Sequence, residues 1–120
     1  MKKLFIISII CFFISSCQER INKVYCKKTI DKELNIRIND NFEIINSNTE
    51  SAIGDYIESF TLKFQEKEYK QLFDQIDTSV LENYNGDSIS EYHKNVGNSE
   101  TINITFHHKT YIIAYVYADL

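Results

Sequence analysis

The apolar residues of this 120-residue chain change their spacing after Gln65, and this change constrains the fold more than any other feature of the sequence. Before it, Phe60, Leu62 and Phe64 alternate with polar residues, which is the two-residue period of a half-buried strand. After it, apolar residues recur three and four positions apart, which predicts a helix over residues 66–81. The apolar positions of this helix are Tyr69, Leu72, Phe73, Ile76 and Val80. An amphipathic strand that leads directly into an amphipathic helix predicts a helix packed on a sheet.

Alternation of apolar and polar residues predicts several further strands, and bulky residues on both faces of 111–117 predict a central strand or one covered on both sides. The predicted strands are residues 34–38, 42–45, 53–64, 102–106 and 111–117. Residues 83–99 are polar and contain Gly86 and Gly97, so we expect a long connection there, with room for a short element around residues 89–92. The order strand, strand, strand, helix, strand, strand predicts an α+β domain, in which an antiparallel sheet of about five strands carries one amphipathic helix on a face.

The N-terminus carries a separate and specific pattern. Lys2 and Lys3 precede a largely apolar segment, residues 4–13, and the tetrapeptide Ile14-Ser15-Ser16-Cys17 follows it. The apolar segment is shorter than the roughly 20 residues that a membrane-spanning helix needs, and the whole pattern is typical of a cleaved signal peptide. The tetrapeptide resembles the lipobox of bacterial lipoproteins. The resemblance implies that the Cys17 thiol receives a diacylglyceryl group and that a peptidase cuts before Cys17.

This interpretation divides the chain into a cleaved lipoprotein signal peptide (1–16), a tether (17–30) and a single α+β domain (31–120). The expected membrane contact is through lipid on Cys17, because two or more acyl chains anchor a protein stably. Gln18 stands where some of these lipoproteins carry an Asp that retains them at the inner membrane. We therefore expect a bacterial cell-envelope location, at the outer membrane or cell surface rather than the inner membrane. The domain also resembles short bacterial lipoproteins of uncharacterised function, which implies no activity.

The charge of the mature chain argues against nucleic acid as a partner. The signal peptide contains Lys2 and Lys3 and no acidic residue, so 11 of the 13 Lys and Arg remain against 17 Asp and Glu, a formal charge of −6. Nucleic acids and anionic lipids bind clustered Lys and Arg, and the sequence contains no basic run of that kind. We predict no nucleic-acid partner.

One cysteine of the mature chain has no assigned role. Cys11 leaves with the signal peptide and Cys17 is expected to carry lipid, so Cys26 has no partner within the chain. Two interpretations stay open, a partly covered thiol at the start of the domain and a disulfide to another chain. Lys27 and Lys28 would favour the thiolate of Cys26.

No motif in the sequence predicts chemistry. His107 and His108 are adjacent and would point to opposite faces of a strand, and His93 stands alone. The acidic residues are scattered, and the sequence has no serine in the Gly-x-Ser-x-Gly pattern of hydrolases, no paired cysteine motif and no glycine-rich phosphate loop. We predict no catalytic residue, no metal site and no cofactor, which makes an enzyme the least supported function.

Tyrosine is enriched in the C-terminal half of the chain, and exposed tyrosines are favoured at protein interfaces. The predicted interaction surface comprises Tyr84, Tyr92 and His93. The leading hypothesis is a non-catalytic module that binds a protein partner of unknown identity or takes part in an envelope complex. An immunity-type protein that masks an attacker is one form of it. The alternative is a carrier lipoprotein that holds a small ligand between the helix and the sheet.

The lipobox interpretation predicts the effect of replacing Cys17. Cys17→Ser removes the thiol that accepts the lipid, so the variant should keep its signal peptide, run as the larger precursor and incorporate no labelled fatty acid. Immunoblotting of membrane fractions after metabolic labelling measures both properties. A Cys17→Ser variant of mature size that is retained on membranes like the wild type would contradict the anchor assignment.

Overall fold

The structure is a computed structural model that describes residues 21–84 and 86–120. Cys17 and the predicted signal peptide lie outside these residues. The helices described are α2 (Lys23–Leu34), α3 (Glu66–Phe73) and the short 3-10 helix η1 (Thr78–Val80). The strands described are β1 (Phe42–Ala52), β2 (Asp55–Phe64), β3 (Glu82–Tyr84), β4 (Ile89–Asn95), β5 (Glu100–His107) and β6 (Ile112–Asp119).

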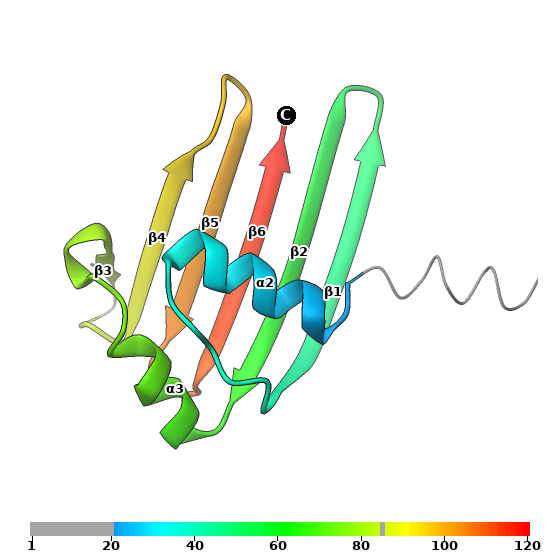
Figure 1. Ribbon diagram of the computed structural model, residues 1–120. Coiled ribbons are helices and arrows are strands. Elements are labelled where there is room, and N and C mark those ends of the chain that lie inside the picture. The colour runs from blue at the N-terminus through cyan, green and yellow to red at the C-terminus, as the bar shows by residue number, and fades with distance from the viewer. Residues whose placement is uncertain (1–20, 85) are drawn as a thin grey trace, which may run out of the picture.

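The six strands form one antiparallel sheet in the order β1-β2-β6-β5-β4-β3. The last strand, β6, lies in the middle of the sheet, where Tyr115 pairs with Phe60 of β2 on one side and with Ile104 of β5 on the other. Figure 1 shows α2 and α3 on the same face of the sheet. The predicted α+β class is confirmed, but the described chain has six strands instead of about five and two α-helices instead of one.

The helix α2 occupies a region for which the sequence predicted the end of a tether and the start of a strand. Asn22 caps its N-terminus, because the Asn22 side chain accepts a 2.9 Å hydrogen bond from the backbone N–H of Tyr25. Asn35 ends it in the left-handed conformation, with a φ of 54°. The tether is wrong for residues 23–30, since Cys26 and Ile30 are fully buried. A buried face of two residues is too narrow to stand out as a helical pattern.

The predicted strand 34–38 is also wrong, although its alternation is real. Ile36 and Ile38 are buried, but side chains satisfy the backbone of this segment where a neighbouring strand would do so in a sheet. The Ile38 N–H donates to Asp31 at 2.8 Å. The Arg37 N–H donates to the side-chain oxygen of Gln75 at 3.0 Å, and the Gln75 amide donates back to the Arg37 carbonyl at 2.8 Å. The first hairpin is instead β1–β2.

The helix α3 begins where the sequence predicts and ends earlier, at Phe73 rather than near residue 81. After it, the N–H groups of Gln75 and Ile76 bond to carbonyls only three residues back, so the chain tightens and leaves the helical path. Tyr69, Leu72 and Ile76 are buried as expected, Phe73 is partly buried, and Val80 is exposed. The apolar spacing thus identified most core residues but overestimated the length of the helix.

The long connection 83–99 contains a strand that the sequence placed only as a short element. Its strand β4 carries Ile89 and then the polar residues Glu91, His93 and Asn95 on one face, and Ser90, Tyr92 and Lys94 on the other. Polar residues occupy both faces because β4 lies near an edge of the sheet and extends beyond the helices. Without an apolar face, the two-residue period cannot be recognised.

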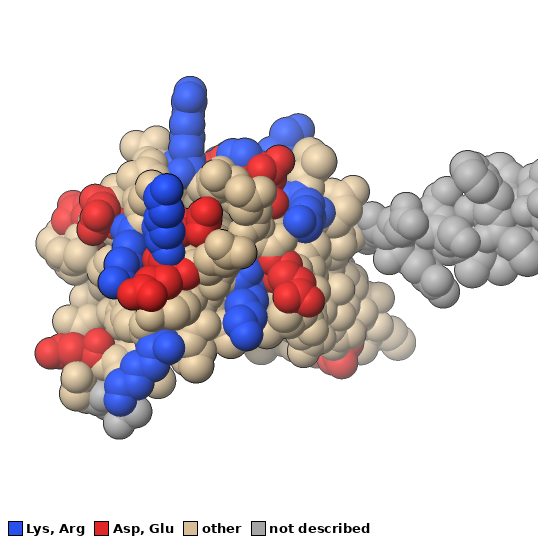
Figure 2. All heavy atoms as spheres, turned by 90° about the horizontal axis from the view of Figure 1, so that it is seen from below, with Lys and Arg blue, Asp and Glu red and all other residues tan. Residues whose placement is uncertain are grey.

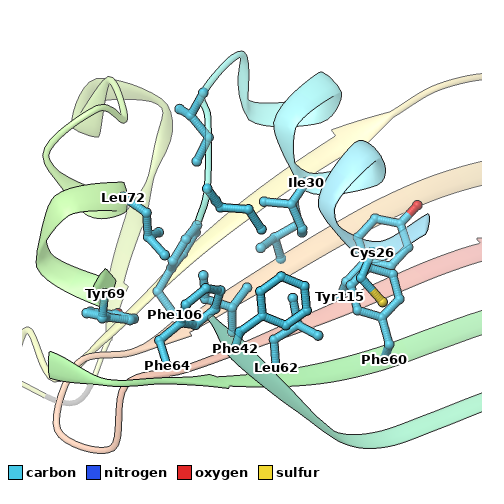
Figure 3. Close-up of a cluster of buried hydrophobic side chains, with 14 of the residues drawn as sticks. Cys26, Ile30, Phe42, Phe60, Leu62, Phe64, Tyr69, Leu72, Phe106 and Tyr115 are labelled. Carbon is cyan, nitrogen blue, oxygen red and sulfur yellow. The ribbon is translucent and has the colours of Figure 1, made fainter. Parts of the chain in front are cut away.

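The core lies between the sheet and the two helices (Figure 3). In this view Cys26 and Ile30 extend from α2 toward the sheet, and the Cys26 thiol lies beside the rings of Phe60 and Tyr115. Burial, with a smaller contribution from the negative charge of Glu58, raises the pKa of Cys26 to about 11. The expectation that Lys27 and Lys28 favour the thiolate is therefore corrected. A fully buried thiol also disfavours the disulfide to another chain.

The helix-to-sheet contact predicts the effect of a charge at Leu72, whose side chain is 2% exposed. Leu72→Asp should lower the free energy of unfolding by several kcal/mol out of a total of about 5 to 15, because the new carboxylate is buried without a partner. Thermal unfolding followed by circular dichroism measures the change. The control is Gln71→Asp on the exposed side of α3, which should unfold close to the wild type. Equal losses in the two variants would show that the packing face is assigned wrongly.

Candidate functional site

The structure separates the residues of the predicted interaction surface. Tyr92 and His93 are neighbours in β4 and therefore point to opposite faces of the sheet. The Tyr92 side chain lies on the helix side, partly buried, and its hydroxyl donates a 2.9 Å hydrogen bond to Glu33. The His93 side chain is exposed and its Nδ1 lies 2.5 Å from Oδ1 of Asn103. Tyr84 belongs to β3, where its backbone pairs with Ile89.

A groove between α2 and the sheet is the more promising site. It has a volume of about 310 Å³. Its lining comes from one side of α2 and from the strands β2, β5 and β6. The lining residues are Tyr25, Thr29, Lys32, Glu33, Glu58, Ile102, Tyr115 and Tyr117. The groove thus combines aromatic rings with carboxylates on the helix-covered face of the sheet.

The groove exists because the strands are longer than the area that the helices cover. In Figure 1, the strands of the sheet extend well past α2, which crosses them obliquely. In β2 the side chains that face the helices are Glu58, Phe60, Leu62 and Phe64. The three apolar residues are buried in the core beneath the helices, whereas Glu58 follows in the same row where the apolar core ends. The row therefore changes from apolar to acidic at the groove.

Glu58 is the most unusual residue of the groove. Its side chain is only 8% exposed, and its Oε1 atom is buried without a hydrogen-bond partner among the described residues. The other oxygen, Oε2, accepts a 3.1 Å hydrogen bond from the hydroxyl of Tyr56. Burying a polar atom without a partner costs about 1 to 3 kcal/mol, and more for a charged group. A residue of this kind lowers stability unless something outside the fold satisfies it.

Two further carboxylates beside the groove are already paired. Glu33 of α2 accepts from the Tyr92 hydroxyl and also forms an ion pair with Lys94, with 3.3 Å between Nζ and Oε1. Glu100 of β5 accepts a 2.9 Å hydrogen bond from the hydroxyl of Tyr117. Tyrosine hydroxyls therefore satisfy the acids of this region. Glu58 differs from Glu33 and Glu100 because one of its oxygens is left over.

The tyrosines of this region stay protonated at neutral pH. Burial is the first cause that raises the pKa of Tyr25 to about 12, and a hydrogen-bonding interaction of its hydroxyl with the Glu58 carboxylate is the second. The approach of the Tyr25 hydroxyl does not give Oε1 of Glu58 a hydrogen bond of normal geometry. Burial likewise raises the pKa of Tyr92 to about 12, with Glu33 as the second cause. The pKa of Tyr115 is raised by burial and by the negative charge around it. The groove therefore offers neutral phenols and negatively charged carboxylates.

A second polar cluster joins α3 to the strands. His108 lies between Tyr69, whose hydroxyl is 2.6 Å from Nδ1, and Ser90, whose Oγ is 2.7 Å from Nε2. A serine beside a histidine raises the possibility of a nucleophile. However, Ser90 is 2% exposed and its hydroxyl donates to Oδ1 of Asn83 at 2.7 Å. All the bonds are satisfied if Tyr69 donates to His108, His108 donates to Ser90 and Ser90 donates to Asn83. This series of hydrogen bonds links α3 to the strands and has a structural role.

Other features of the surface are less specific. A hollow of about 200 Å³ beside His108 is lined by residues of α3 and by Tyr111, and a hollow of about 390 Å³ near Phe42 is lined largely by exposed side chains. Figure 2 shows the molecule from below the view of Figure 1, and on that side Lys and Arg alternate with Asp and Glu without forming a continuous basic patch. Within residues 21–84 and 86–120, no group of three or more His, Cys, Asp or Glu is placed to hold a metal ion.

Comparison with known proteins adds no family to these observations. No protein-family model, curated protein or solved structure matches the chain. No helix in the described part of the chain is long and apolar enough to cross a membrane. The function is therefore inferred from the sequence and the geometry.

Sequence reasoning missed the groove because the wall that α2 forms was assigned incorrectly. Tyr25 and Thr29 fell in the predicted tether, and Glu33 fell at the border of a predicted strand. One signal was available. In the strand 53–64, Glu58 occupies the same alternating row as Phe60 and Leu62, and a carboxylate in an apolar row indicates either the end of the core or a site.

The His108 cluster predicts how stability depends on pH. Burial lowers the pKa of His108, and the neighbouring His107 lowers it further. In the unfolded chain a histidine has a pKa of about 6.5, so the unfolded state binds more protons than the folded state below that pH. This contribution to stability is complete above about pH 6.5 and is lost as the pH falls toward the lower, folded-state pKa.

Melting temperatures at about pH 7.5 and about pH 5 test this linkage. The wild type should lose stability on acidification, and His108→Gln should lose less, because it removes the group whose pKa differs between the two states. His93→Gln, at an exposed site, should behave as the wild type. An unchanged pH dependence in His108→Gln would contradict the assignment.

Proposed function

We propose that this protein is a lipid-anchored, non-catalytic binding protein of the bacterial cell envelope, and that the groove between α2 and the sheet is its binding site. The observation that carries the proposal is Glu58, a nearly buried carboxylate whose Oε1 atom has no partner among the described residues. Sites that bind ligands keep polar groups at a cost to stability, because those groups are satisfied only when the ligand is present. The remaining lining combines three tyrosines and Ile102, whose surfaces suit binding, with the polar side chains of Thr29, Lys32 and Glu33.

The lipid anchor is proposed from the lipobox resemblance at Cys17. The fold then determines how close the domain would lie to the membrane. Ile21 already packs against the core, only four residues after Cys17. Four residues span at most about 14 Å. With lipid on Cys17, the folded domain would lie directly at the membrane surface, closer than the longer expected tether would hold it. The groove would then act on partners or ligands near that surface.

Binding is preferred over catalysis because the groups that could act together with Glu58 are already engaged within the protein. Glu33 is held by Tyr92 and Lys94, and Ser90 directs its proton to Asn83 rather than to His108. The phenols of the groove have raised pKa values and do not act as bases near neutral pH. These arrangements support a role in recognition.

Two kinds of occupant fit the groove. A protein partner fits the aromatic lining, which is typical of interface centres. A small ligand fits the volume of about 310 Å³, which lies at the lower end of the range of about 300 to 1,000 Å³ for small-molecule sites. That volume is the specific observation in favour of the carrier as the second candidate function.

Site-specific photocrosslinking in the native envelope tests the proposal. A benzophenone amino acid replaces Thr29, which lines the groove, in the full-length lipidated protein. The matched control carries the same group at Lys28, which is exposed on the same helix and does not line the groove. Irradiation should give an adduct from position 29 in much higher yield than from position 28. Mass spectrometry then separates a protein adduct from a small-molecule adduct.

The outcome that would contradict the proposal is a lack of any adduct specific to position 29. Equal adduct yields from both positions would likewise indicate random encounters at the surface. A protein adduct supports the interaction module, whereas a small-molecule adduct supports the carrier.

A further inference from the structure

We propose that the groove recognises an organic cation, an alkylammonium or guanidinium group, which places its positive charge against Glu58. This inference rests on the proposed function, because it names the chemistry of the occupant of the same groove. One oxygen of Glu58 lacks a hydrogen-bond donor. The Oε1 atom of Glu58 is buried and without a partner, and a carboxylate oxygen can only accept hydrogen bonds. Alkylammonium and guanidinium groups supply N–H donors together with the compensating charge.

The aromatic rings around Glu58 favour a cation over a neutral donor. Tyr25, Tyr115 and Tyr117 line the same groove, and Tyr56, which bonds to Glu58, lies with its ring centroid 6.0 Å from that of Tyr117. One face of the Tyr115 ring stacks on Phe60 at 4.6 Å. Organic cations are attracted to aromatic faces within about 6 Å of the ring centroid, and the attraction is stronger where water is excluded.

The charges of the lining argue against an anion. Glu33 and Glu58 are negative and Lys32 is the single cation among the lining residues, on the exposed side of α2. The nearby Lys94 already pairs with Glu33. An anion in the groove would face the unpaired carboxylate of Glu58, and this repulsion is strong in a site of low dielectric constant. A cation neutralises that carboxylate.

A metal ion fits the groove less well than an organic cation. Calcium takes six to eight oxygen ligands and magnesium an octahedral set. No cluster of three or more His, Cys, Asp or Glu suited to a metal is found in the described segments 21–84 and 86–120. The rings and Ile102 instead present surface that contacts the carbon atoms of an organic group.

The same charged group could come from a free amine or from a Lys or Arg side chain of a protein partner. Two matched pairs of probes distinguish the charge from the shape. n-Butylammonium, which carries N–H donors, is compared with butan-1-ol, an uncharged molecule of similar shape, as the free ligand. To represent a protein side chain, Nα-acetyl-lysine amide, which keeps its side-chain ammonium group, is compared with the uncharged Nα-acetyl-norleucine amide. Binding of each to the full-length protein in detergent is measured by isothermal titration calorimetry.

The expected result is that a charged probe binds at least about ten-fold more tightly than its neutral counterpart, as expected for a charge-assisted hydrogen bond. Glu58→Gln keeps the shape and removes the charge, so it should remove this preference. Glu43→Gln, at an exposed position of β1 outside the groove, should keep it. The melting temperature of Glu58→Gln should equal or exceed that of the wild type, which shows that a lost preference does not reflect unfolding. A preference limited to the lysine probe assigns the source to a protein.

Equal binding of charged and neutral probes, no binding of any charged probe, or an unchanged preference in Glu58→Gln would overturn the inference. Failure of this inference is distinguishable from failure of the proposed function. If photocrosslinking from position 29 is specific while the cations do not bind, the groove is a binding site for another chemistry. If neither experiment detects an occupant, both proposals fail.

Discussion

The packing of α2 across the sheet is the contact on which the rest of the structure depends. Cys26 and Ile30 are its buried residues, and each is fully enclosed. Full burial of a side chain such as isoleucine stabilises a fold by about 1.5 to 3 kcal/mol. This contact also fixes how the chain continues, because Asp31 of the same helix accepts from Ile38 and so holds the segment that leads into β1.

The position of α2 also creates the groove. The core between helices and sheet takes up Phe60, Leu62 and Phe64 of β2, and the next inward position of the row is Glu58. If the helix covered more of the sheet, Glu58 would have to be apolar or fully paired. The strands extend past α2 (Figure 1), so part of the sheet is left uncovered by the helix. The groove and Glu58 lie at the border of that uncovered part.

The sequence allowed the fold class to be predicted but not the site, for physical reasons that differ between segments. The strand β5 carries one clear apolar row, and β6 carries apolar residues on both faces, so both were recognisable. The strand β4 has polar side chains on both faces, and α2 buries only two residues, so neither produces a recognisable period. The groove depends on both α2 and the tertiary packing that brings Glu33 and Glu58 to one place. No pattern within a single segment predicts that these two residues lie close together.

The two buried polar clusters show why only one of them is a candidate site. Around His108, each donor finds an acceptor and the last proton goes to Asn83, so the cluster is complete within the protein. Around Glu58, the Tyr56 hydroxyl occupies one oxygen and the other is left without a partner among the described residues. A complete network stabilises the fold by itself, whereas an incomplete one costs stability. Glu68 of α3 also has a buried oxygen, Oε2, without a partner among the described residues, but Glu68 does not line the groove. The incomplete cluster around Glu58 is therefore the place where the groove leaves room for a group from outside the chain.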